Sequence, residues 1–251
     1  MTTVTPQPLK TGLTLWALGL VGIASLLTTT FPLTNLPKVV LEKFTPEQLQ
    51  LLMLVNPTLF LIIAVVVGSL LYRKVNLKLV DKEKLTAPNA VGYVFKTSIL
   101  PGIVAGLLIL GVVWVFQQLT PSEMAKLNGA DTSISPLARF LYGGITEEIL
   151  LRFGLMTLFV WAASRLFHTQ KPIVYWVGII LSALLFGAGH LPALKLLVPD
   201  PSATLTLYII LGNSVAGVVF GWIYWRYGLV LAMIAHAAAH VVLLTSELIA
   251  G

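Results

Sequence analysis

Long apolar segments separated by short polar connections dominate the pattern of this chain. A helix that crosses a bilayer needs about 20 mostly apolar residues. Seven segments meet this requirement, and they cover residues 12–33, 48–72, 97–118, 135–166, 172–190, 204–225 and 229–249. The fourth is too long for one upright crossing, so we expect its axis to tilt strongly or its first turns to lie in the interface. The predicted fold class is all-α: a polytopic membrane helix bundle with about seven transmembrane helices.

The composition agrees with a membrane protein and excludes an ordinary soluble domain. Of 251 residues, 57% are hydrophobic and 10% are charged, whereas a soluble domain carries about 25% charged residues. Cysteine is absent, so neither a disulfide framework nor a thiol nucleophile is available. The net charge of +6 does not by itself indicate nucleic acid, because basic residues in a membrane chain mark its topology. We expect membrane lipids, and no nucleic acid, as partners.

Lys and Arg residues are distributed unevenly between the two sets of connections. If the N-terminus is cytoplasmic, the inner set is Lys10, Arg73, Lys74, Lys78, Lys82, Lys84, Lys96, Arg165, Lys171 and Arg226, and the outer set is Lys38, Lys43, Lys126 and Lys195. This bias predicts a cytoplasmic N-terminus and an outer C-terminus. The basic stretch 73–96 is expected to be a cytoplasmic loop, and its charges are either a plain topology signal, which is the preferred interpretation, or a contact with the anionic leaflet. The compact length without a long tail favours a multi-pass protein of a prokaryotic inner membrane.

A few ionisable side chains lie within the apolar segments. A charge at the bilayer centre costs at least about 2.5 kcal/mol, so such residues are either paired for structure or retained for function. Glu148 and Arg152 are four positions apart and share a helix face, which allows them to pair. Glu147 is rotated by about 100° from Glu148 on an α-helix, so its partner must come from another helix. A purely structural buried network is the alternative to a functional site.

Histidines favour the functional alternative. His190 ends the fifth segment, while His236 and His240 lie four positions apart in the seventh, with three alanines between them. We predict that these three rings and Glu147 converge on one polar cavity. A carboxylate with imidazoles in a dry cavity is suited to activating water, and imidazoles can stabilise an oxyanion or bind a metal that does so.

A covalent nucleophile is not indicated by these residues. No serine or threonine is adjacent to a histidine in the sequence, although Ser182 and Ser214 remain open on spatial grounds. The chemistry that the residues predict is therefore hydrolysis by activated water within the membrane.

Three motifs in order resemble the CPBP family of intramembrane proteases, which includes type II CAAX prenyl endopeptidases and bacteriocin-processing or self-immunity proteins. "EEILLR" (Glu147, Glu148, Arg152) is similar to EExxxR, "FGAGH" (Phe186, His190) to FxxxH, and "HAAAH" (His236, His240) to a variant of HxxxN. The resemblance covers about residues 135–245. We expect this range to be the catalytic core of a single membrane-embedded domain formed by residues 1–251.

The resemblance implies a role for each motif residue. Glu147 would activate water with help from His190, and His236 would orient or polarise the scissile carbonyl. Supporting roles would fall to Glu148, Arg152 and Phe186, with Phe186 shaping the cavity wall. His240 departs from the asparagine that the eukaryotic prenyl proteases use as an oxyanion donor. It would either donate in place of that asparagine or complete a zinc-like ligand set with His190, His236 and Glu147. A metal-free mechanism stays equally open.

The implied function is an intramembrane endopeptidase that hydrolyses a peptide bond of a membrane-associated or prenylated protein or peptide. The alternatives are a proton-coupled transporter and a non-catalytic, peptide-binding immunity protein. The charge bias places His190 near the outer end of its span, whereas CAAX proteases are expected to open toward the cytosol. Either the site faces outward, which suits an exported peptide, or the span count is off by one.

Overall fold

The computed structural model describes residues 8–30, 36–128 and 134–250. The structure is 87% helical and has no β-strand in these three ranges. Among the residues described, seven helices are long and apolar enough to span a membrane: Leu9–Thr28, Pro46–Val75, Ala90–Leu119, Pro136–Leu166, Pro172–Leu197, Ala203–Tyr227 and Leu229–Ile249. The predicted polytopic bundle of seven helices is therefore confirmed. The third span begins at Ala90 rather than at 97, because the end of the predicted loop 73–96 is helical.

Several spans consist of more than one helical element. In chain order, the elements are α1 (Pro8–Ser25), η1 (Leu26–Thr28), α2 (Lys38–Lys43), α3 (Pro46–Met53), α4 (Val55–Leu71), η3 (Tyr72–Val75), α5 (Lys82–Thr86), α6 (Ala90–Val94), η4 (Phe95–Ile99), α7 (Leu100–Leu119), α8 (Pro121–Asn128), α9 (Pro136–Ala138), η5 (Arg139–Glu147), η6 (Ile149–Met156), α10 (Thr157–Leu166), α11 (Pro172–Gly189), α12 (Leu191–Leu197), α13 (Ala203–Tyr227) and α14 (Leu229–Ala250). Elements η4, η5 and η6 are π-helical.

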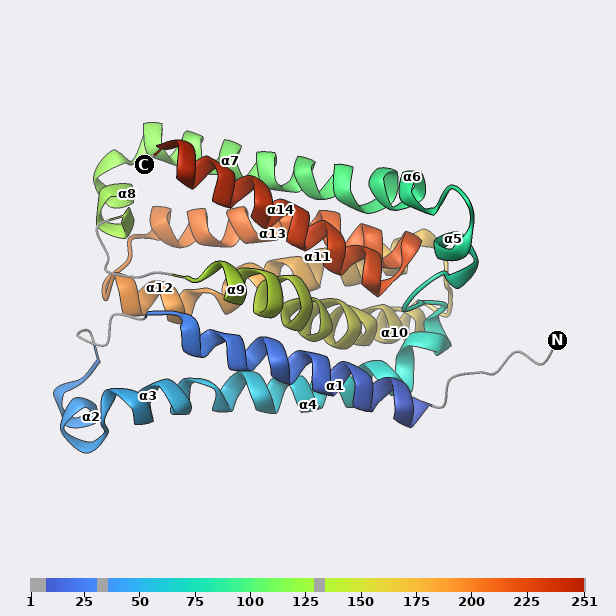
Figure 1. Cartoon of the computed structure of the whole chain (residues 1–251), viewed down its shortest axis with the longest axis horizontal. Helices are drawn as coiled ribbons and strands as arrows, with labels where there is room; N and C mark the ends of the chain where they lie inside the picture. The colour runs from blue at the N-terminus through green and yellow to red at the C-terminus, as the bar shows by residue number, and fades with distance from the viewer. Residues whose placement is uncertain (1–7, 31–35, 129–133, 251) are drawn as a thin grey trace.

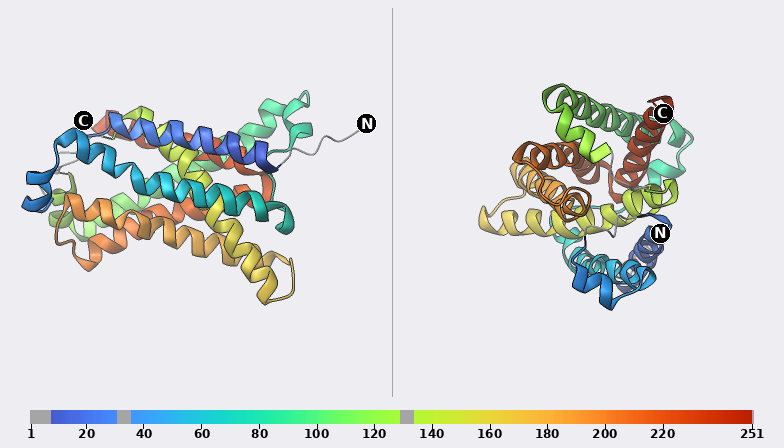
Figure 2. Two further views of the ribbon diagram at one scale, coloured as in Figure 1. Left: turned by 90° about the horizontal axis from the view of Figure 1, so that it is seen from below. Right: turned by 90° about the vertical axis from the view of Figure 1, so that its left-hand side faces the viewer.

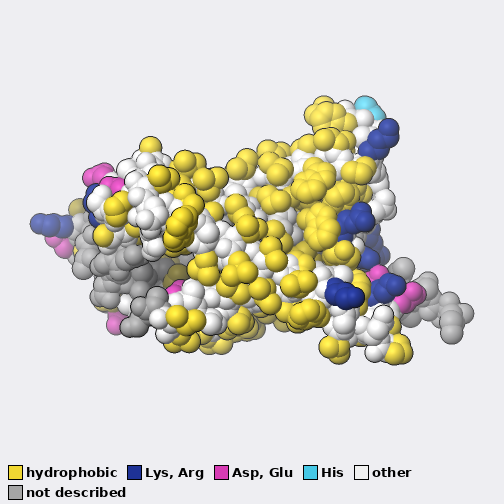
Figure 3. All heavy atoms as spheres, turned by 90° about the horizontal axis from the view of Figure 1, so that it is seen from above, with side chains coloured by type: hydrophobic (Ala, Val, Ile, Leu, Met, Phe, Trp, Pro, Cys, Tyr) yellow, Lys and Arg dark blue, Asp and Glu magenta, His cyan; other side chains and the backbone are white. Residues whose placement is uncertain are grey.

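The seven spans run side by side, so their connections collect at two opposite ends of the bundle (Figure 1). One end, here named the α5 end, carries α5 and α6, the α10–α11 turn and the α13–α14 turn. The other, the α12 end, carries η1, α2, α3, α8 and α12 (Figure 1). Hydrophobic side chains cover the middle of the surface, and most of the visible Lys and Arg side chains gather at the α5 end (Figure 3).

Small residues let α11 and α13 approach closely. A Cβ atom added to Gly217 would lie 2.9 Å from the Cβ atom of Ala183, and one added to Gly221 would lie 3.2 Å from a methyl carbon of Ile179. Helix association in a membrane depends on such close packing, because lipid tails are as apolar as the side chains that they replace. The GxxxG spacing of the sixth span is therefore used inside the monomer.

The fourth span is the most irregular one. It crosses the bundle obliquely, from α9 to α10 (Figure 2), as expected for a segment that is too long for an upright crossing. Most of its central part is π-helical rather than α-helical, so the rotation of about 100° between Glu147 and Glu148, expected for an α-helix, does not apply. π-Helical turns are rare and frequently occur at functional sites.

Candidate active site

A cavity of about 1010 Å³ lies between the helices that carry the three motifs. Its wall is mostly apolar and contains residues of α4, η5, η6, α11, α13 and α14. Glu147 and the histidines His190, His236 and His240 all line it. The structure thus brings the ionisable groups of three separate spans to one cavity.

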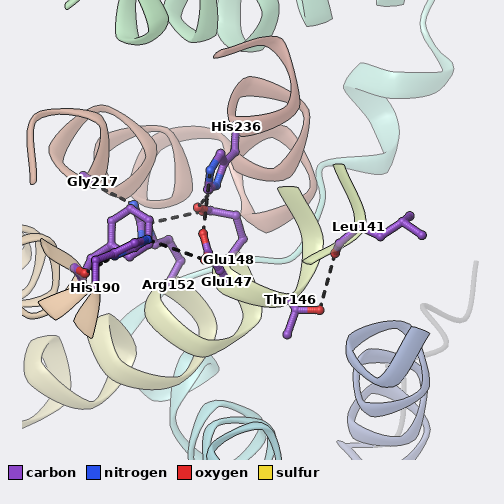
Figure 4. Close-up of polar contacts among 9 residues, drawn as sticks. Leu141, Thr146, Glu147, Glu148, Arg152, His190, Gly217 and His236 are labelled. Atoms are coloured by element: carbon purple, nitrogen blue, oxygen red, sulfur yellow. Dashed lines mark hydrogen bonds and ion pairs between the residues drawn. The ribbon is translucent and has the colours of Figure 1, made fainter. Parts of the chain in front are cut away.

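Glu147 points between two imidazoles that come from different helices (Figure 4). Its Oε1 atom lies 4.0 Å from Nε2 of His190 in the segment between α11 and α12, and its Oε2 atom lies 3.9 Å from Nε2 of His236 in α14. Both distances are too long for a direct hydrogen bond, but one water molecule can bridge each of them. The side chain of His190 is 34% exposed and that of Glu147 is 15% exposed, so solvent can reach the carboxylate.

The other nitrogen of each ring is held by an acceptor. Nδ1 of His190 lies 2.8 Å from the carbonyl oxygen of Phe186, and Nδ1 of His236 lies 3.0 Å from Oε1 of Glu148. A carbonyl and a carboxylate only accept hydrogen bonds, so each Nδ1 carries the proton and donates it. In the neutral rings, Nε2 is then the atom with a lone pair, and in both rings it faces Glu147.

Glu148 and Arg152 form a fully buried pair beneath this site. Nε of Arg152 lies 3.4 Å from Oε2 of Glu148, and both side chains are 0% exposed. The Nη2 atom of Arg152 donates to the carbonyl oxygen of Gly217 at 3.2 Å. The guanidinium carbon lies 5.1 Å from the ring centroid of Phe186 and 5.6 Å from that of Phe220. Since Glu148 also accepts from His236, this pair connects η6 and α13 to the imidazole in α14.

His240 occupies a different position in the cavity wall. Its ring stacks on that of His236 at a centroid distance of 4.8 Å and an interplanar angle of 18°, and the ring of Phe140 meets its edge. Neither ring nitrogen of His240 has a hydrogen-bond partner among the described residues. A Cβ atom on Gly143 would lie 2.5 Å from Nε2 of His240, so a glycine at this position leaves space for the ring.

The zinc ligand set that the resemblance implies, Glu147, His190, His236 and His240, stays a prediction. In the ranges that the structure describes, no group of three or more His, Cys, Asp and Glu side chains could hold a metal ion. Ligand atoms about 2.1 Å from a tetrahedral zinc lie about 3.4 Å from each other, whereas the oxygen atoms of Glu147 lie 3.9 and 4.0 Å from the two Nε2 atoms. The role of zinc stays a prediction without support from these distances.

The hydroxyl groups of the two serines that the sequence allows as nucleophiles, Ser182 and Ser214, are not part of the cavity wall. The hydroxyl of Ser182 donates to the carbonyl oxygen of Ile179 at 3.1 Å, and that of Ser214 donates to the carbonyl oxygen of Ala183 at 3.0 Å. Both side chains are buried. They take part in helix packing rather than in the cluster around Glu147.

Polar groups other than the motif residues also line the cavity. Asn213 of α13 and Tyr142 of η5 are part of its wall, as is Arg139, which forms an ion pair of 2.8 Å with Glu247. Asn213 was recognisable in the sequence as an amide at membrane depth, but nothing in its spacing connected it with the motifs. Nothing in the sequence indicated that Tyr142 lines the cavity or that Arg139 pairs with Glu247.

The fold and this cluster define a multi-pass integral membrane protein with a carboxylate–imidazole site. Residues 130–242 match the family described as type II CAAX prenyl endopeptidase Rce1-like, which is consistent with the CPBP family indicated by the motifs. The resemblance is therefore confirmed over these residues. The family is one of proteases, which supports a hydrolase at the family level. No curated protein and no solved structure matches the chain.

Proposed function

We propose that the protein is an intramembrane endopeptidase in which Glu147 activates a water molecule for attack on a peptide bond. The observation that carries this proposal is the position of the Glu147 carboxylate, 3.9 Å and 4.0 Å from two imidazole nitrogens in a cavity at membrane depth. One water molecule beside each pair of atoms can hydrogen-bond to both of them. Cysteine is absent, and the hydroxyls of Ser182 and Ser214 are bonded to backbone carbonyls, so attack by water is the favoured route.

The partners of the two rings suggest how the reaction proceeds. A water molecule that donates its hydrogen atoms to Glu147 and to Nε2 of His190 presents its lone pair to the scissile carbonyl. Glu147 accepts the proton as the C–O bond forms, and the same proton passes to the leaving nitrogen as the C–N bond breaks. His236, whose Nδ1 donates to Glu148, donates from Nε2 to the oxyanion when its ring is protonated. One such donor contributes a factor of about 10²–10³ in rate.

The cavity wall favours a substrate that is associated with the membrane. Three apolar side chains of this wall are exposed: Phe60 and Ile63 in α4 are 61% and 57% exposed, and Leu185 in α11 is 47% exposed. This exposure supports access to the cavity from the lipid at α4 and α11. An apolar segment or lipid chain can lie against this wall without leaving the hydrocarbon region, while the peptide bond next to it meets Glu147.

The proposal is tested by replacing Glu147 with Gln in purified, reconstituted protein and measuring cleavage of a membrane-anchored peptide. Loss of the base should lower the rate by a factor of about 10²–10⁴. Glu83→Gln is the matched control, because Glu83 is exposed in α5, far from the cavity, and should leave the rate unchanged. Equal cleavage by Glu147→Gln and wild type would remove Glu147 as the base. No cleavage by the wild type would favour a carrier or a peptide-binding protein.

A further inference from the structure

The cavity is displaced toward one end of the bundle. Among the residues that line it, Leu26 belongs to η1, Gln50 to α3, and Pro192 and Ala193 to α12, and all four lie at the α12 end. Pro192 and Ala193 are exposed. The described segments at the α5 end, residues 72–96, 166–171 and 226–229, contribute nothing to the lining. A soluble peptide chain would therefore reach Glu147 from the α12 end.

Basic residues are concentrated at the opposite end. The end turns and connections at the α5 end contain ten Lys and Arg residues against two acidic ones, Asp81 and Glu83. At the α12 end, the described connections carry Lys38, Lys43, Lys126 and Lys195. The space-filling view shows the same asymmetry (Figure 3). Since Lys and Arg near the ends of spans are retained on the cytoplasmic side, the α5 end is the cytoplasmic end.

We infer that the cavity opens on the non-cytoplasmic face of the membrane. The substrate class that follows is a membrane-tethered segment of an exported polypeptide, with the scissile bond on the outer side of its anchor. Only this substrate class rests on the proposed function. In the described ranges, seven helices are long and apolar enough to span a membrane, which agrees with the count from the sequence. The basic connections and the end residues that line the cavity lie at opposite ends of these spans. A tail displayed in the cytosol would not reach Glu147.

Sidedness can be measured directly, because the chain contains no cysteine. Ser122 lies in α8 at the α12 end and Thr86 lies in α5, and both are exposed. Ser122→Cys and Thr86→Cys each add one thiol of similar size and leave every charge in place. With a membrane-impermeant maleimide on intact bacterial spheroplasts, Ser122→Cys should be labelled and Thr86→Cys should be labelled only after permeabilisation. The reverse pattern would overturn the inference.

A second measurement separates this inference from the proposed function. A peptide that the wild-type protein cleaves in detergent is placed next to a single transmembrane anchor, on the outer side in one reporter and on the cytoplasmic side in the other. The outer reporter should be cut in cells and the inner one should stay intact. Cleavage of the inner reporter alone would overturn the sidedness and leave the protease activity standing. No cleavage in detergent would overturn the proposed function, while the labelling result would still decide the orientation.

Discussion

Arg152 offers a quantitative test of the buried pair beneath the site. Its side chain is 0% exposed, lies 3.4 Å from Glu148 and donates to the carbonyl oxygen of Gly217. The change Arg152→Met keeps an unbranched side chain between the rings of Phe186 and Phe220 but leaves the carboxylate of Glu148 without its cation. Removing one partner of a buried ion pair costs about 3–5 kcal/mol. We therefore expect the free energy of unfolding to fall by about that amount.

Thermal unfolding in detergent, followed by intrinsic tryptophan fluorescence, measures this loss. In a chain of this size, 1 kcal/mol corresponds to about 2–4 °C in Tm, so the expected decrease is roughly 6–20 °C. Arg165→Met is the matched control. Arg165 is exposed in the last turn of α10, and a surface substitution of this kind stays within about 0.5 kcal/mol.

The double variant Glu148→Gln/Arg152→Met tests the cause of the loss. If the cost of Arg152→Met comes from an uncompensated charge, replacing the carboxylate should restore about 1–3 kcal/mol. The double variant should then unfold at a higher temperature than Arg152→Met alone. Two results would contradict an uncompensated charge as the cause. One is a Tm for Arg152→Met equal to that of Arg165→Met, and the other is a loss of stability in the double variant equal to the sum of the two single losses.

Three further predictions concern packing, the nucleophile and the metal. Gly217→Leu should lower the free energy of unfolding by about 1–3 kcal/mol, because the larger side chain overpacks against Ala183. The control Gly111→Leu has open space at its Cβ position and should unfold at the wild-type temperature. Thermal unfolding of the two variants measures both effects. Ser214→Ala should cleave the peptide at the wild-type rate, and a loss as large as that of Glu147→Gln would instead indicate a serine nucleophile. The distances between the Glu147 oxygen atoms and the two Nε2 atoms predict that a chelator leaves cleavage unchanged and that metal analysis finds no stoichiometric zinc. A loss of cleavage in chelator that added zinc restores would contradict this prediction.

The spans, their number and their charge bias could be predicted from the sequence, because each depends only on local hydropathy and on the positions of Lys and Arg. The pairing of Glu148 with Arg152 was also predictable, since both residues lie on one helix within a single turn. The motif residues could be named as candidates because ionisable groups are rare in a chain with 10% charged residues. The catalytic roles assigned to them stay predictions.

Contacts between spans were decided by the tertiary structure alone. The hydrogen bond from His236 to Glu148, the position of Glu147 between two rings, and the cavity that residues of the α12 end help to line all depend on how far each helix is rotated and how deep it lies. The π-helical course of η5 and η6 also left no signal in the hydropathy pattern. The physical reason is that a span that is apolar on every face tolerates either lipid or another helix around it, so its sequence specifies that it crosses the membrane but not which face meets which neighbour.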